Sequence, residues 1–219
     1  MPHPFERNAG YALIIFTLMM LFTMVFHPAG GSFEHLLELT GMTIITHSVA
    51  ICSLPFAGIG FWGLTKKLGA TRFLSVTAFA FIIPGLIAVM LAAAANGIVL
   101  PLFINLYRNA TPEKIESLKP LMKYNFTVNL AFDYIYTGAF TIAILLWSAA
   151  ILQTKKMPVW LGWAGIVLAL VIATGMFAGF TPNHLHVFRM FVVAIIVWVV
   201  LTGIQLIKLS NTENATAES

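Results

Sequence analysis

The sequence predicts an all-α membrane protein, a bundle of six transmembrane helices with both termini on the cytoplasmic side. Composition is the first reason, because 59% of the 219 residues are apolar and only 9% are charged, whereas a soluble domain carries about 25% charged residues. The second reason is that uncharged stretches of about 20 residues, the length that spans a bilayer, recur between short charged loops. The third is the distribution of lysine and arginine, which sets the orientation of membrane proteins.

The apolar runs divide into six predicted spans, at residues 9–27, 37–64, 72–98, 121–153, 158–180 and 183–208. We expect the first span to be retained as a helix, because no small-residue cleavage site follows it. The uncharged run that begins at Phe73 is too long for one straight span. Pro84 is therefore expected to kink this helix, and Gly97 and Pro101 to break it.

The starts of the later spans carry clear signals. Thr111-Pro112-Glu113 supplies an N-cap, a proline at the first helical position and an acid near the positive end of the helix. Thr181-Pro182 gives a similar signal for the sixth span, and Pro158 opens the fifth. Residues 112–123 form a short amphipathic segment that we expect at the membrane surface, leading into the fourth span.

The basic residues orient the bundle. Seven cations flank the predicted inner ends of the spans and favour the cytoplasm by the positive-inside rule: Arg7, Lys66, Lys67, Arg72, Lys155, Lys156 and Lys208. Four others lie in the third loop, on the predicted outer side: Arg108, Lys114, Lys119 and Lys123. The prediction is one transmembrane domain over residues 1–210, followed by a disordered polar tail at 211–219.

Several classes of protein are excluded or disfavoured. Cys52 is the single cysteine, so an intrachain disulfide, an iron–sulfur cluster and a cysteine-rich zinc site are excluded. The net charge of +4 comes from short loops and does not indicate nucleic acid as a partner; the expected surroundings are the lipid bilayer. No predicted span has a central lysine that could form a Schiff base with retinal.

Asp133 is the only acidic residue between Tyr124 and Thr154. A carboxylate at the centre of a span costs roughly 2.5–3.5 kcal/mol on insertion scales, so such a residue usually faces a partner or a water-filled cavity. Residues four apart share one face of a helix, and this spacing groups five polar residues: Asn125, Asn129, Asp133, Thr137 and Thr141. We expect this polar face to line an interior.

A second polar stripe, Thr40, Thr43 and His47, follows the second span. At 1.5 Å per residue His47 lies roughly 18 Å below His35, and Asp133 lies roughly 15 Å below Lys123. The two residues are therefore at similar depth.

The leading functional hypothesis is a polar cavity that opens outward and binds a small amphiphilic or anionic, lipid-like ligand. The guanidinium of Arg189 is suited to a carboxylate or a phosphate. The predicted ligand-binding residues are Asp133, Arg189, His47, Asn125, Asn129 and Thr43.

A zinc-dependent intramembrane hydrolase is the second hypothesis, since imidazole and carboxylate groups suit zinc. The candidate ligands gather at the outer ends of the spans: His27, His35, His184, His186 and Glu34. Asp133, His47 and Glu38 are the candidate catalytic residues. The spacing of His184 and His186 places their rings on different faces of a regular helix, however, and the chain has no His-Glu-x-x-His motif.

The third hypothesis is a structural or partner-binding subunit in which Arg189 neutralises Asp133 or Glu38 within the bundle. The sequence thus leaves open whether the chain is an enzyme. Haem held by two histidines at matching depth is disfavoured, because only His47 lies deep in a span; a haem near the outer surface, between His35 and His186, is the form that stays open.

Two short stretches resemble an uncharacterised family of bacterial multi-pass membrane proteins: Arg7-Asn8-Ala9-Gly10-Tyr11 and Trp160-Leu161-Gly162-Trp163-Ala164-Gly165-Ile166. This resemblance implies a bacterial inner-membrane protein and supplies no catalytic residues. Ceramidase-like hydrolases hold zinc with histidines and an aspartate, but the His-x-His at 184–186 departs from their wider spacing, and they usually have seven spans.

Overall fold

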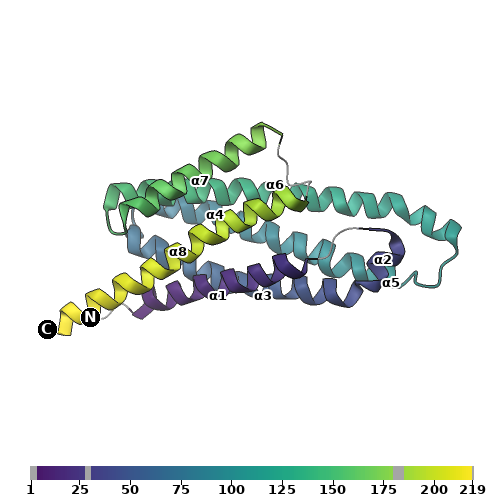
Figure 1. Ribbon diagram of the computed structural model, residues 1–219, viewed down its shortest axis with the longest axis horizontal. Helices are drawn as coiled ribbons and strands as arrows, with labels where there is room; N and C mark the ends of the chain where they lie inside the picture. The colour runs from purple at the N-terminus through teal and green to yellow at the C-terminus, as the bar shows by residue number, and fades with distance from the viewer. Residues whose placement is uncertain (1–3, 28–30, 180–184, 219) are drawn as a thin grey trace.

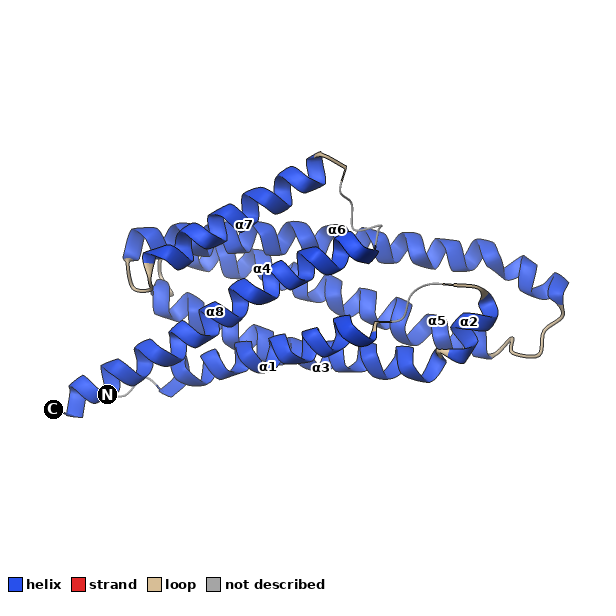
Figure 2. Ribbon diagram, in the orientation of Figure 1, coloured by secondary structure: helices blue, strands red, loops and turns tan. Residues whose placement is uncertain are grey.

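A computed structural model describes residues 4–27, 31–179 and 185–218, with side chains described at 5–27, 31–179 and 189–213. Helix makes up 90% of the structure, and no strand occurs in the described ranges (Figure 2). The elements in chain order are α1 (Pro4–Phe26), α2 (Phe33–Glu38), α3 (Thr40–Gly69), α4 (Phe73–Ala94), the π-helix η1 (Ala95–Val99), α5 (Leu100–Asn105), α6 (Pro112–Thr154), α7 (Val159–Phe177) and α8 (Leu185–Glu218).

Six helical stretches in the described residues are long and apolar enough to cross a membrane, as predicted, and they fit a multi-pass membrane protein. The bundle is elongated, and both termini lie at one end, together with the turns that join α3 to α4 and α6 to α7 (Figure 1). We call this the terminal end. Helix α2 and the connection from α5 to α6 lie at the opposite, distal end.

The third span differs from the expectation that it breaks near Gly97. Helix α4 runs into η1 and then directly into α5, so the chain stays helical from Phe73 to Asn105. Pro84 lies inside α4, and Pro101 lies in the first turn of α5. Because proline has no N–H to donate, the wider π-helical turn just before Pro101 accommodates the missing hydrogen bond.

The amphipathic segment at residues 112–123 is the first part of α6, a single helix of 43 residues. Its predicted start is confirmed, because the Thr111 hydroxyl accepts a hydrogen bond from the Lys114 amide at 3.4 Å. At 1.5 Å per residue α6 is roughly 65 Å long, about twice the ~30 Å hydrocarbon core of a bilayer. The distal part of α6 therefore extends beyond the hydrocarbon, with Leu118 and Met122 buried in a small apolar cluster that includes residues of α2 and α5.

Residues 211–218 continue α8 as helix, in contrast to the disordered tail that their polar composition predicts. Lys67, near the end of α3, forms ion pairs with Glu213 of α8 and Glu6 of α1. These contacts hold the first turn of the polar extension against the bundle.

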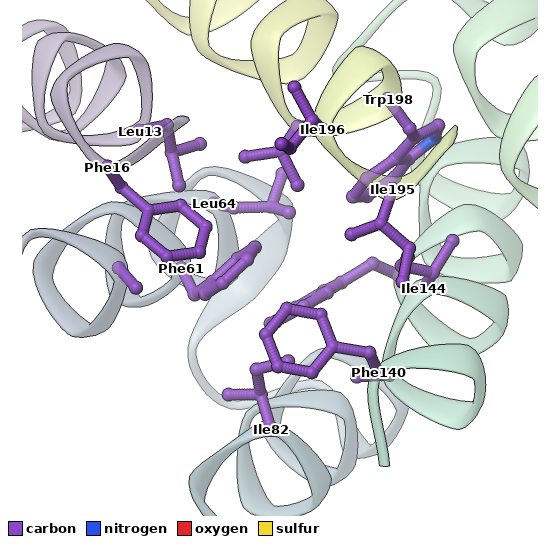
Figure 3. Packing of buried hydrophobic residues seen from close by; sticks show 14 of the residues in the cluster. Leu13, Phe16, Phe61, Leu64, Ile82, Phe140, Ile144, Ile195, Ile196 and Trp198 are labelled. Atoms are coloured by element: carbon purple, nitrogen blue, oxygen red, sulfur yellow. The ribbon is translucent and has the colours of Figure 1, made fainter. Parts of the chain in front are cut away.

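Large aromatic side chains fill the core towards the terminal end. Phe61 of α3 stacks on Trp147 of α6 with ring centroids 5.0 Å apart and an angle of 14° between the planes. The rings of Phe16 and Phe140 meet the Phe61 ring edge-on (Figure 3). The Trp147 indole donates a hydrogen bond to the Thr65 hydroxyl at 3.1 Å, so the one polar atom of this fully buried side chain is satisfied.

The helices of the bundle differ in how closely their backbones approach one another. Gly60 and Gly63 lie directly against Leu13 and Ala9, so α3 and α1 approach closely. Helix α1 also packs on α8, while α6 packs on α4 and α7. The backbones of α6 and α8 do not run close together in the described residues, although Ile144 of α6 and Ile195 of α8 belong to the same packed cluster (Figure 3).

Candidate functional site

An open cavity of about 370 Å³ lies in the distal half of the bundle, lined by residues of α1, α3, α4, η1, α6 and α8. It brings together the two residues that the sequence predicts at similar depth, Asp133 and His47. The polar lining comprises Thr23, His27, His47, Asn96, Asn129, Asp133 and Tyr136. The remaining lining residues are Met20, Met24, Gly31, Ala50, Val89, Ala92, Ala93, Phe126, Leu130 and Val192.

Asp133 is half-buried on the inward face of α6. The Asn129 side-chain amide donates a hydrogen bond to Asp133 Oδ2 at 3.0 Å. The Thr137 hydroxyl donates to the backbone carbonyl of Asp133 at 2.7 Å and does not reach the carboxylate. No lysine or arginine among the described side chains forms an ion pair with Asp133. The carboxylate therefore has acceptor capacity left for a group in the cavity.

His47 is 5% exposed and has a defined orientation. Its Nδ1 lies 2.8 Å from the backbone carbonyl of Thr43, one turn earlier in α3. A carbonyl oxygen can only accept, so we assign the proton to Nδ1, which leaves Nε2 of the neutral ring as an acceptor. The ring of His27, at the end of α1, meets the His47 ring edge-on with centroids 5.0 Å apart.

The π-helical turn η1 contributes a further side of the cavity, next to those formed by α3 and α6. A Cβ atom added at Gly97 would overlap the His47 ring, so the absence of a side chain there is what lets η1 approach α3. The preceding residue, Asn96, lines the cavity and accepts a hydrogen bond from the Asn125 amide of α6 at 3.2 Å. π-Helical turns occur frequently at functional sites.

The predicted ligand-binding residues thus divide into three groups. Asp133, His47 and Asn129 line the cavity. Asn125 and Thr43 are not among the lining residues, but each contacts one that is: Asn125 bonds Asn96, and the Thr43 carbonyl bonds His47.

Arg189 forms the third group, because it lies outside the cavity lining. Its Nη2 donates to the backbone carbonyl of His27 at 3.0 Å, which links α8 to the end of α1. It forms no ion pair with Asp133 or Glu38, although the sequence makes both residues available. This one hydrogen bond uses only part of the guanidinium, whose buried Nε has no hydrogen-bond partner in the described residues.

The acidic and histidine residues of α2 face away from the cavity. Glu34, His35 and Glu38 are exposed. Two hydrogen bonds lower the pKa of the Glu34 carboxyl, the larger effect coming from a backbone amide at the start of α2 and the smaller from the Ser32 hydroxyl. Within the described residues no group of three histidine, cysteine or acidic side chains is placed to hold a metal ion. His184 and the side chain of His186 lie outside the described residues, so the full predicted zinc set stays a prediction.

Sequence reasoning missed Asn96, Thr23 and the two methionines of α1 that line the cavity. Asn96 carried the clearest signal, as a lone amide beside Gly97 in an otherwise apolar run. Comparison with protein-family models, curated proteins and solved structures finds no match for this chain.

Proposed function

We propose that this protein binds a small amphiphilic molecule in the distal cavity, with the polar head of the ligand between Asp133 and His47. The observation that supports this proposal is that both side chains line one cavity and each keeps an unfilled acceptor position. The carboxylate and Nε2 accept hydrogen bonds, so the matching head is a donor such as a hydroxyl or an amine. The anionic alternative depended on Arg189, which is not among the residues that line the cavity.

The rest of the cavity suits an apolar tail. Met20, Met24, Val89 and Leu130 supply apolar surface beside the polar groups, and methionine adapts readily to irregular ligands. A volume of about 370 Å³ falls within the roughly 300–1,000 Å³ that is usual for small-molecule sites. Because α6 and α8 both line the cavity while their backbones do not run close together, access from the side of the bilayer is the route that we favour.

The test uses three single-chain probes that share a tail and differ in the head: decanol, decylamine and decanoate. We expect decanol and decylamine to raise the unfolding temperature of the purified protein, and decanoate to have no effect. Asp133→Asn should remove most of the decylamine effect. Thr141→Val is the matched control, because Thr141 belongs to the same stripe but donates to its own helix. Equal responses to all three probes in all variants would show that the effect is detergent-like and would exclude a binding site.

The orientation is also part of the proposal: a bacterial inner membrane, termini in the cytoplasm and the cavity nearer the outer face. The seven cations at the span ends support it through the positive-inside rule. Lys66→Cys and Asn109→Cys, each in a Cys52→Ser background, should be labelled by an impermeant thiol reagent from the inside and the outside, respectively. Labelling of Lys66→Cys from the outside would show that the proposed orientation is wrong and that the termini lie outside.

A further inference from the structure

A second hollow, of about 420 Å³, lies at the terminal end of the bundle, far from the distal cavity. Five charged side chains line it: Glu6, Lys66, Lys67, Lys156 and Glu213. They come from α1, the end of α3, the turn after α6, and α8. The proposed binding of an amphiphile makes no use of these residues.

The two carboxylates of the hollow are already engaged by one lysine. Lys67 is 7% exposed, and its Nζ lies 3.2 Å from Glu6 Oε2 and 2.5 Å from Glu213 Oε1. Ion pairs of Lys67 with both carboxylates reduce the negative charge that a ligand in the hollow would meet. They also connect three helices, so the base of the hollow is held in place.

The other two lysines have no carboxylate partner among the described side chains. Lys66 Nζ lies 4.5 Å above the Phe5 ring, and Lys156 is exposed beyond the end of α6. Glu6 Oε2 is buried and accepts no hydrogen bond, so Lys67 meets it as an ion pair only. The lining therefore holds two lysines without a carboxylate partner, while both of its carboxylates face Lys67.

The depth of the hollow matches the headgroup layer. Glu6 belongs to the first turn of α1, Lys66 and Lys67 to the last turns of α3, and Lys156 follows the last residues of α6. These are the positions at which the apolar runs end. Basic pockets between transmembrane helices at this level bind the headgroups of anionic lipids.

We propose that this hollow binds the phosphate of an anionic phospholipid. The ammonium groups of Lys66 and Lys156 would donate to the phosphate oxygens, and lysine is a common phosphate ligand. Lys67, fixed by Glu6 and Glu213, forms the floor and holds the helices at the spacing that the headgroup needs. The recognised chemistry is a phosphate ester, which either a lipid or a soluble phosphate could supply.

The experiment compares protein in nanodiscs of phosphatidylcholine alone with protein in nanodiscs that also contain phosphatidylglycerol. Native mass spectrometry should show phosphatidylglycerol retained by the wild-type protein. The Lys66→Gln/Lys156→Gln variant should retain it about thirtyfold less, as expected for the loss of two interfacial charges, and Lys66→Arg/Lys156→Arg should restore retention. A cooperative thermal unfolding transition of each variant in nanodiscs of phosphatidylcholine alone would show that the variant is folded.

The matched control is Lys155→Asn/Lys208→Gln, which removes two charges from the same end without touching the hollow. Asparagine is chosen at position 155 because Lys155 has a φ of 52°, which asparagine tolerates. An equal loss in this control would overturn the proposal in favour of diffuse surface charge. A third measurement adds glycerol 3-phosphate, a soluble phosphate ester, to the wild-type protein. If glycerol 3-phosphate stabilises the protein as strongly as phosphatidylglycerol does, the site binds soluble phosphate and the lipid assignment is wrong.

Discussion

The terminal and distal halves of the bundle place polar side chains differently. In the terminal half, hydroxyls such as those of Thr65 and Thr202 donate to carbonyls of their own helices. In the distal half, Asn125 bonds Asn96 across two helices, and Asp133 has an amide partner and a cavity beside it. A threonine can satisfy its hydroxyl within its own helix, whereas a carboxylate has no donor and must find one elsewhere. Residue type therefore separates structural polar groups from those that need a partner or a ligand.

If the terminal half is the structural half, its aromatic core should give the largest loss of stability. Trp147→Ala removes a fully buried ring that stacks on Phe61, and we expect a loss of about 3–5 kcal/mol. Thermal unfolding in detergent measures this, and decylamine binding should persist below the lowered unfolding temperature. Trp160→Ala is the control, because Trp160 is 48% exposed and its loss should cost within about 0.5 kcal/mol. Equal effects of the two substitutions would contradict the division into halves.

Gly97→Val should separate stability from binding in the distal half. Its side chain would overlap the His47 ring, and overpacking of this kind costs about 1–3 kcal/mol. Displacing the ring should also abolish decylamine binding, measured by the shift in unfolding temperature. Gly138→Ala is the control, since a Cβ there meets nothing within 4 Å. Unchanged binding in Gly97→Val would show that His47 plays no part in the site.

The fold follows closely from the sequence, because span length, capping and hydropathy are local properties. Thr111 caps α6 as its sequence predicts, and six helical stretches of the described residues are long and apolar enough to span a membrane. The site follows only in part. Spacing along α6 and α3 indicates that Asp133 and His47 face inward at one depth, but the partner of a long side chain depends on how the helices pack. Arg189 illustrates this, because its guanidinium binds the carbonyl of His27, a residue far away in sequence. A backbone acceptor leaves no mark in the sequence.

Thr141→Val should have the smallest effect, although Thr141 belongs to the same stripe as Asp133. Its hydroxyl donates to the Thr137 carbonyl at 2.7 Å, a carbonyl that belongs to the helix ladder in any case, and valine has nearly the same shape. We expect a change within about 0.5 kcal/mol and unaltered decylamine binding.

Asn129→Leu, one turn before Asp133, provides the contrast with Thr141→Val. It removes the amide that donates to Asp133 Oδ2, so a half-buried carboxylate loses its partner, at a cost of about 1–3 kcal/mol. If the two substitutions had the same effect on unfolding in detergent, the distinction between self-satisfied hydroxyls and partner-dependent polar groups would fail for this helix.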